Sequence, residues 1–199
     1  MSTQKIVIGL TGGPGSGKGE VVKFLTKLGY RHFSAREDIL WPEVDRCKLP
    51  RDRTSLNTVS NELRVMYGPE YVAHTLFSTA CRAPGNAVIE SIYTVGEIVT
   101  IRHDAEDRVM GIKFILISVD APLHVRYKRI QRRASETDKV SFEQFSVQEQ
   151  REQTSTDPSK HNLFACRELA DLQVVNNFLD VQSLHNTLQR MFRIAKLTS

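Results

Sequence analysis

The chain has 199 residues, of which 40% are hydrophobic and 25% are charged, a composition that excludes collagen-like, low-complexity and disordered classes. Its formal net charge of +4 predicts only a weak preference for anionic partners, because excess charge says more about solubility than about chemistry. Its 3 cysteines are widely spaced and form no Cys-x-x-Cys pair, so the sequence supports neither a disulfide framework nor a zinc site.

Membrane insertion and secretion are also unexpected for this sequence. The longest apolar run, Phe114 to Val119, is much shorter than the roughly 20 residues that a membrane helix requires, so it is expected to be a buried strand. The N-terminus passes from polar residues directly into Lys5–Leu10, which leaves no room for the apolar part of a signal peptide. We therefore expect a cytoplasmic protein with no membrane partner.

Short β-like runs alternate with longer helical stretches along the chain, which is typical of βαβ units that fold onto a parallel sheet. The pattern predicts an α/β fold in one domain, residues 1–199, with about five parallel strands and helices on both faces. The strands are expected at Lys5–Leu10, Tyr30–Ser34, Asn86–Ser91, Ile112–Val119 and Leu172–Asn176.

A glycine-rich segment from Gly12 to Lys18 follows the first strand and precedes an amphipathic helical pattern. It has the Gly-x-x-x-x-Gly-Lys spacing of a phosphate-binding loop, or P-loop, in the strand-to-helix context that this loop requires. Glycines let backbone N–H groups close around a phosphate, and the lysine reaches the β- and γ-phosphates. The segment predicts binding of ATP or GTP, and a glycine turn without a ligand is the alternative. The predicted contacts come from Gly13, Pro14, Gly15, Ser16, Gly17 and Lys18, with Lys18 also acting in catalysis.

The residues after the lysine depart from the usual pattern. Gly19 stands where a hydroxyl residue normally helps to hold Mg²⁺, and Glu20 comes next. The string resembles the loop of adenylate-kinase-type nucleotide kinases, which also have Gly after the Lys but carry Thr where this chain has Glu20. The resemblance implies a three-layer α/β/α P-loop NTPase with Gly19 and Glu20 beside the nucleotide, and it leaves the Mg²⁺ ligand to another residue.

Further helices are predicted by apolar spacing and by residues that favour helix ends. Gly29 and Gly68 are expected to end the helices that begin after the loop and near residue 55. Pro69 and Pro122 can each open a helix, and Asp120 is placed to cap the second of these. The apolar stripes on which these helices are based are Val21, Val22, Leu25 and Leu28, then Leu56, Val59, Leu63 and Met66, and finally Leu184, Leu188 and Met191.

Two carboxylates are candidates for the Mg²⁺ site. Glu90 ends the third predicted strand, and ligands of open α/β sheets bind beyond the carboxyl ends of strands. It is therefore expected to hold the metal through water. Asp120 competes for this role from the end of the fourth strand, but its expected function as a helix cap makes Glu90 the preferred ligand.

A basic segment after the fourth strand places Arg126, Arg129 and Arg133 on one helical face. Together with the phosphate loop, it predicts a lid at about residues 126–160 that contacts the triphosphate and excludes water. Arg129 is expected to act in catalysis, and Arg126 and Arg133 to bind the nucleotide. A solvated basic helix or an RNA-binding patch is the alternative. The polar stretch from 134 to 160 is expected to be partly helical around Ser141–Phe145.

Beyond the loop, segments along most of the chain resemble dephospho-CoA-kinase-like and deoxynucleoside-monophosphate-kinase-like P-loop proteins. The resemblance implies ATP-dependent transfer of a phosphoryl group to a small phosphorylated acceptor bound by residues 35–82. The segments are Gly13–Glu20, Ser34–Leu40, Arg51–Leu56, Asn61–Arg64, Tyr67–Glu70, Val88–Ile92, Gly96–Glu97, Ser118–Ala121, Arg126–Ile130, Asp171 and Asn176–Asn177.

The resemblance also implies roles for individual residues on the acceptor side. Arg53 and Arg64 are expected to face the acceptor, and arginine binds phosphate in a bidentate manner. Asp38 is expected to orient or deprotonate the attacking oxygen. The family's third strand ends in an acidic residue followed by Gly-Ile-Arg or Ser-Ile-Arg, whereas this chain has Tyr93 in place of the Arg. Tyr93 is thus a predicted substrate-binding residue, and the loss of a phosphate-binding arginine can lower a phosphoryl-transfer rate by about 10³–10⁵-fold.

Two other functions remain open. A nucleotide-sensing domain with little catalysis would explain the departures at Glu20 and Tyr93. The kinase-like domains attached to deoxycytidylate deaminases are of this kind, but this chain lacks the His-x-Glu and Pro-Cys-x-x-Cys motifs of the deaminase site. A nucleic-acid-associated NTPase would use the basic segment, which has few interleaved aromatic residues, and we therefore do not expect a nucleic-acid partner.

Overall fold

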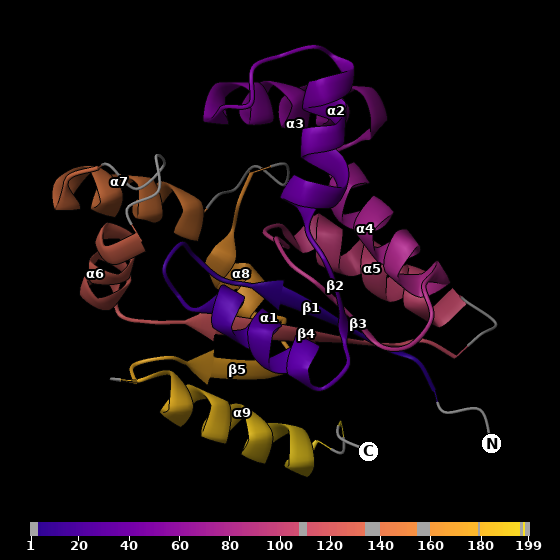
Figure 1. The fold of residues 1–199 in the computed structure, drawn as a ribbon, viewed down its shortest axis with the longest axis vertical. Coiled ribbons are helices and arrows are strands. Elements are labelled where there is room, and N and C mark those ends of the chain that lie inside the picture. Colours follow the sequence, from indigo (N-terminus) through magenta and orange to yellow (C-terminus); the bar gives the residue numbers. More distant parts are fainter. Residues whose placement is uncertain are drawn as a thin grey trace.

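The computed structural model describes residues 4–107, 111–133, 140–154, 160–178, 180–195 and 197, with the backbone alone at Arg53. Its centre is a five-stranded parallel sheet in the order β2-β3-β1-β4-β5, flanked by helices (Figure 1). The predicted α/β class is confirmed, and each expected strand is present, although β2 and β3 are shorter than expected. The strands are β1 Ile6–Thr11, β2 Arg31–Phe33, β3 Ala87–Ile89, β4 Lys113–Asp120 and β5 Leu172–Val175.

The helices pack on both faces of the sheet. Successive residues of a strand point to opposite faces, so Val7 and Ile8 of β1 enter two different hydrophobic clusters. One cluster joins the sheet to α3, α4 and α5, and the other joins it to α1 and α9. The helical elements are α1 Lys18–Lys27, the π-helix η1 Ala35–Leu40, α2 Trp41–Arg46, α3 Arg53–Tyr67, α4 Tyr71–Arg82, α5 Val95–Asp107, α6 Leu123–Arg133, α7 Phe142–Gln153, α8 Leu163–Glu168 and α9 Val181–Ile194.

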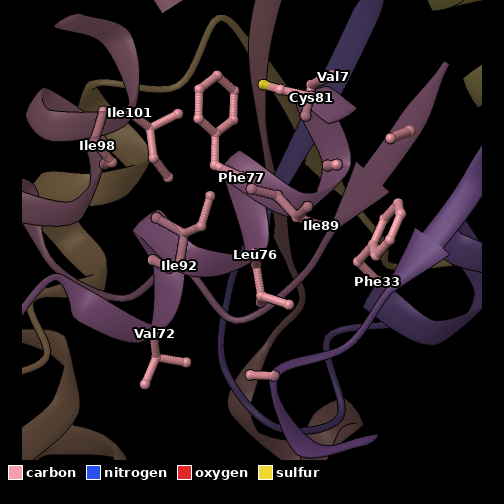
Figure 2. Close-up of a cluster of buried hydrophobic side chains, with 14 of the residues drawn as sticks. Val7, Phe33, Val72, Leu76, Phe77, Cys81, Ile89, Ile92, Ile98 and Ile101 are labelled. Atoms are coloured by element: carbon pink, nitrogen blue, oxygen red, sulfur yellow. The ribbon is translucent and has the colours of Figure 1, made fainter. Parts of the chain in front are cut away.

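The first cluster is built around large side chains with no exposed surface. Figure 2 shows Phe77 of α4 and Ile98 and Ile101 of α5 in the same cluster as Ile89 of β3. Burial of each such side chain stabilises a fold by about 1.5–3 kcal/mol. These contacts fix α4 and α5 against one face of the sheet. The carboxyl ends of β1 and β3 lie next to each other because the two strands pair in parallel.

The helix ends agree with the sequence in most places. Gly29 and Gly68 follow α1 and α3 with φ angles of 86° and 103°, a left-handed conformation that favours glycine. α7 begins after Ser141, whose side chain accepts a hydrogen bond from the backbone of Gln144, and this confirms the helical segment expected there. Among the described residues, no helix combines the length and apolarity that a membrane span requires.

The expected cap of α6 is wrong. Asp120 is the last residue of β4, and its carbonyl oxygen accepts the N–H of Asn176 at 2.6 Å, which keeps it in the sheet. α6 begins at Leu123, and the carbonyl of Pro122 accepts its first backbone bonds. The Asp120 carboxylate instead accepts the N–H of Ala121 at 2.8 Å and pairs with Arg167 at 3.3 Å. The reason for preferring Glu90 over Asp120 as the metal ligand is therefore removed.

Candidate functional site

The segment from Gly12 to Gly17 forms a tight loop between β1 and α1, at the carboxyl end of the central strand. Gly12 has a φ angle of 137°, and a Cβ atom there would lie 2.1 Å from the carbonyl oxygen of Val119. Gly17 has a φ angle of 109°, and a Cβ atom there would lie 2.2 Å from the side-chain nitrogen of Asn176. Both glycines are thus required by backbone conformation and by close packing against the ends of β4 and β5.

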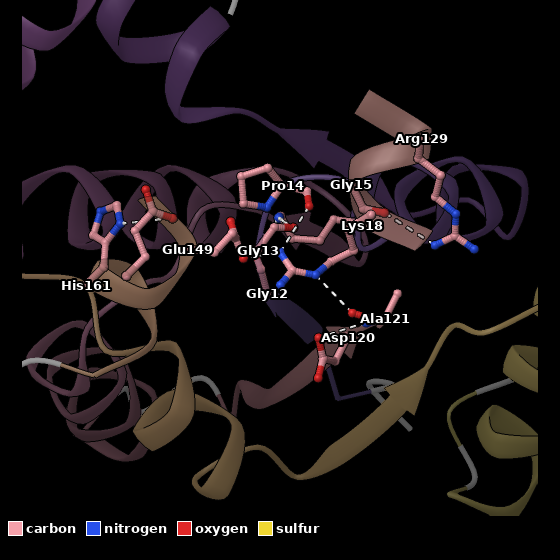
Figure 3. Close-up of polar contacts among 12 residues, drawn as sticks. Gly12, Gly13, Pro14, Gly15, Lys18, Asp120, Ala121, Arg129, Glu149 and His161 are labelled. Atoms are coloured by element: carbon pink, nitrogen blue, oxygen red, sulfur yellow. Dashed lines mark hydrogen bonds and ion pairs between the residues drawn. The ribbon is translucent and has the colours of Figure 1, made fainter. Parts of the chain in front are cut away.

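Lys18, the first residue of α1, extends its side chain back over this loop. Its ammonium donates hydrogen bonds to the carbonyl oxygens of Gly12 and Gly13, the latter at 3.1 Å (Figure 3). Burial lowers the pKa of Lys18 to about 8, although the carboxylates of Glu90 and Glu149 act in the opposite direction. The charge is therefore held in a poorly solvated position, where an anion would interact with it strongly.

Ser16 adds a polar atom that the protein does not satisfy. The residue is fully buried, and its hydroxyl has no hydrogen-bond partner within the described part of the chain. Buried polar atoms are normally paired, so an exception inside such a loop fits a site where a ligand oxygen supplies the missing bond. The loop amides, the start of α1, Lys18 and Ser16 together could hold a polyphosphate.

Two of the three predicted lid arginines reach the loop. Arg126 is buried, donates from Nε to the carbonyl of Ala121 at 2.9 Å, and lies 3.4 Å from the carbonyl of Pro14. Arg129 donates to the carbonyls of Gly15 and Ser16, both at 3.3 Å. Arg133 is exposed in the last turn of α6. The structure thus brings Arg126 and Arg129 to the loop and leaves Arg133 at the surface.

Arg129 also connects the loop to the segment after β5. Its second guanidinium nitrogen donates to the carbonyl of Asn176 at 3.0 Å and to that of Phe178 at 3.4 Å. The Asn176 side chain in turn donates to the carbonyl of Ser16 at 2.8 Å. This network fixes the position of α6 relative to the loop.

Glu149 of α7 was missed by sequence reasoning. Its carboxylate forms a short ion pair with Arg126, in which the two side chains are 4% and 5% exposed. Burial raises the pKa of Glu149, and the neighbouring Arg126 partly opposes this effect. The available signal was the four-residue spacing from Phe145, since these two residues are the buried positions of α7. A pocket of 660 Å³ adjoins the pair and is lined by Asp120, Ala121, Pro122, Leu123, Arg126, Ser146, Glu149, Gln150, Gln153 and Val175.

Glu90 follows β3 directly, as expected, and lies in the electrostatic neighbourhood of Lys18. Burial disfavours ionisation of its carboxyl, but His32 at 3.5 Å, Ser34 and Lys18 outweigh this effect and lower its pKa. An ionised carboxylate at a strand end beside the loop fits a Mg²⁺ ion held through water. Among the described residues, no three His, Cys, Asp or Glu side chains are grouped as a metal cluster.

Tyr93 lies between Lys18 of the loop and His161. Lys18 Nζ is 5.9 Å from the centre of its ring, and the ring of His161 is 4.6 Å away on centroids. Burial raises the pKa of Tyr93 to about 12, so its hydroxyl is neutral at physiological pH. Its carbonyl accepts the N–H of Asn162 at 2.9 Å, which fixes residues 161 and 162 near the site.

The loop that carries Tyr93 is held by Glu97, a second residue that sequence reasoning did not assign. The Glu97 carboxylate accepts the N–H groups of Tyr93 at 2.7 Å and Thr94 at 3.0 Å, and the Thr94 hydroxyl accepts the N–H of Glu97. This is a capping box, and its Thr-x-x-Glu spacing was readable in the sequence. Burial raises the pKa of Glu97, while Tyr93, Thr94 and Arg64 act against the rise, so Arg64 is in the same neighbourhood.

Asp38 has a local structural role. Its Oδ2 accepts the N–H of Ser34 at 2.6 Å, and its own N–H bonds to the carbonyl of Ser34 at 2.9 Å, at the start of η1. This contact neither requires nor excludes a role toward an acceptor, so the catalytic role of Asp38 stays a prediction. Arg53 is the first residue of α3, and its side chain lies outside the described part of the structure, as do residues 134–139 and 155–159 of the predicted lid.

The chain is similar to known proteins in both sequence and fold. A UPF0200 protein of Thermococcus sibiricus is 29% identical over 174 residues, which is 86% of either chain. Shikimate kinase from Bacteroides thetaiotaomicron has a TM-score of 0.55 at 13% identity and covers 94% of this chain and 98% of its own. APS kinase from Mycobacterium tuberculosis has a TM-score of 0.53 at 13% identity and covers 96% of this chain and 98% of its own. These likenesses show the fold of small P-loop kinases.

The model of the AAA domain family (AAA_18) matches residues 8–155, which include the loop, Glu90, Tyr93, the lid arginines and Glu149. The chain therefore belongs to the AAA domain family.

Proposed function

We propose that this protein is a kinase that transfers a phosphoryl group from ATP to a small phosphorylated acceptor, such as a nucleoside or deoxynucleoside monophosphate or dephospho-CoA. The observation that carries the proposal is the convergence of Lys18, Arg126 and Arg129 on one glycine loop. Phosphoryl transfer needs positive charge around the transferred group and its leaving oxygen, and it needs little covalent chemistry from the protein.

On the donor side, the amides of Gly13–Gly19 and the start of α1 would surround the β- and γ-phosphates. Lys18 is close enough to reach them, because its ammonium already spans the loop. Arg126 and Arg129 would neutralise the charge that develops on the leaving group. Glu20, in the first turn of α1, pairs with Lys23 at 2.7 Å and would lie at the edge of the nucleotide site.

Mg²⁺ would be held by Glu90 through water, and it would supply further charge neutralisation at the phosphates. The lowered pKa of Glu90 keeps its carboxylate ionised at neutral pH, which a metal ligand requires. Asp120, which does not cap α6, is the alternative ligand, from the end of β4 on the other side of β1.

On the acceptor side, residues 35–82 would form the binding surface. Arg64 and Arg53 would bind the acceptor's phosphate, and Asp38 would orient or deprotonate its attacking oxygen. Tyr93 would line the acceptor site, since it lies beside Lys18 and its N–H bonds to Glu97, on whose carboxyl Arg64 also acts. Shikimate kinase and APS kinase, which share the fold, are named as kinases of small molecules, and the latter was solved with AMPPNP and APS.

The test is an acceptor screen with Mg-ATP. The protein is incubated with nucleoside monophosphates, deoxynucleoside monophosphates or dephospho-CoA, and the ADP formed with each is measured by a coupled assay. We expect ADP formation that depends on one acceptor class and is abolished in Lys18→Met. Binding of ATP without acceptor-dependent ADP would instead support a nucleotide sensor, and stimulation by RNA or DNA alone would support a nucleic-acid-associated NTPase.

A further inference from the structure

The ion pair between Arg126 and Glu149 lies directly against the phosphate loop. A Cβ atom added at Gly13 would be 2.6 Å from Arg126 Nη1 and 3.0 Å from Glu149 Oε2. Arg126 comes from α6 and Glu149 from α7, so the pair joins two helices to the loop at one point. The lid helix α7 therefore contacts the loop through a carboxylate.

This carboxylate is an anion inside a cationic site. Glu149 interacts electrostatically with Lys18 as well as with Arg126. Each of these two cations also donates a hydrogen bond to a carbonyl oxygen of the loop. An Arg–carboxylate bond and an Arg–phosphate bond use the same guanidinium donors and similar geometry. Glu149 thus makes with Arg126 the kind of contact that a nucleotide phosphate would make.

Separation of the Arg126–Glu149 pair is also energetically unfavourable unless another anion takes the place of the carboxylate. Both side chains are almost fully buried, and removal of one partner of a buried ion pair leaves an uncompensated charge. A phosphate that displaced Glu149 would compensate Arg126 at once, whereas Glu149 would have to return to water as α7 moved away. Phosphate binding and the position of α7 are thereby linked.

We propose that Glu149 is a latch: its carboxylate takes the place of a phosphate at Arg126, holds α7 against the loop, and competes with the polyphosphate of the nucleotide. The proposal rests on the nucleotide site described above and concerns its regulation. Nucleotide binding would release the Glu149 carboxylate from Arg126 and so release α7 from the loop.

The latch predicts the direction and size of a change in affinity. The apparent Kd equals the Kd of the open state divided by the fraction of protein that is open. If the latched state outnumbers the open state by ~10 to 1 or more, the apparent Kd is therefore raised by about the same factor. Removal of the carboxylate would therefore tighten binding by about tenfold or more. The gain would apply to ligands that carry phosphates and not to adenosine.

The experiment compares Glu149→Gln with Glu143→Gln by titration calorimetry. Gln keeps the size of the side chain and removes its charge, and Glu143 is an exposed glutamate in the first turn of the same helix. The probes are ATP, inorganic tripolyphosphate and adenosine. Glu149→Asp, which retains the charge on a side chain one methylene shorter, is the second variant, and far-UV circular dichroism confirms that each variant is folded.

We expect tighter binding of ATP and tripolyphosphate in Glu149→Gln and Glu149→Asp, with no change in Glu143→Gln. Unchanged or weaker binding in both Glu149 variants, with normal binding by the wild-type protein, would overturn the latch and leave the nucleotide site standing. No binding of either phosphate ligand by any of the four proteins would overturn the nucleotide site and the latch together.

Discussion

The replacement of Gly17 by alanine tests the packing that shapes the phosphate loop. Gly17 has a φ angle of 109°, and the new methyl group would lie 2.2 Å from Asn176 Nδ2. Asn176 cannot remain where it is, because its side chain would clash with this methyl group. Its movement would break the hydrogen bond that the same nitrogen donates to the carbonyl of Ser16 at 2.8 Å. The loop and the segment after β5 must both shift.

The expected cost has two parts. A non-glycine residue in the left-handed region costs roughly 1–2 kcal/mol. The loss of the buried bond from Asn176 to Ser16 adds about 1–3 kcal/mol, since it leaves a buried donor or acceptor unsatisfied. We therefore expect Gly17→Ala to lower the free energy of unfolding by about 2–5 kcal/mol.

Gly19→Ala is the matched control, two residues further along. Gly19 lies in the first turn of α1, and a Cβ atom there meets no atom within 4 Å. Alanine favours a helix over glycine by up to about 1 kcal/mol, so this variant should be equally or more stable than the wild-type protein. Urea unfolding followed by circular dichroism measures both variants. A Gly17→Ala protein as stable as Gly19→Ala would refute the packing described here.

Two further predictions concern the ionisable groups of the site. Because the free protein holds the pKa of Lys18 at about 8 and a bound polyphosphate would raise it, ATP affinity should be nearly constant at pH 7 and below as far as this group is concerned, and about twofold lower at pH 8. Above pH 8 the ATP affinity should fall further, by up to about tenfold per pH unit. Calorimetry in buffers of different ionisation enthalpy should show that protons are taken up on binding. An affinity that stays constant up to about pH 9.5 would contradict the lowered pKa of Lys18. Glu97→Ala should destabilise the protein by about 1–3 kcal/mol, because the amides of Tyr93 and Thr94 lose their acceptor. Glu106→Ala, at an exposed position of the same helix, should change urea unfolding little, and equal effects of the two variants would show that the capping box is unimportant.

The parts of the fold that the sequence predicts well are those with local causes. β1 and β4 are continuous apolar runs because both faces of a central parallel strand are buried, and such runs are readable without knowledge of the partner strands. The loop from Gly12 to Lys18 is readable for a similar reason, since backbone conformation demands its glycines. β2 is the least distinct strand, and it is also short and at the edge of the sheet.

The parts that could not be predicted depend on contacts between distant segments. Arg126 and Glu149 are 23 positions apart on different helices, and nothing in either local sequence shows that they pair. The prediction that Asp120 caps α6 was wrong for the same reason. The carbonyl of Asp120 accepts the N–H of Asn176, which directly follows β5, and this distant contact keeps Asp120 in the strand. Sequence spacing shows only which residues are chemically able to play a role. The partner that the fold brings next to each residue decides which hydrogen bond or ion pair it makes.

The central claim is that the loop and the Lys18 ammonium together bind a polyphosphate. Calorimetric titration of the wild-type protein and Lys18→Met with ATP tests it directly, with circular dichroism to confirm that both are folded. We predict saturable binding by the wild-type protein and loss of that binding in Lys18→Met, because the apolar replacement keeps the side-chain length and removes the charge. Equal affinity in the two proteins, or no heat of binding in the wild-type protein, would contradict the claim.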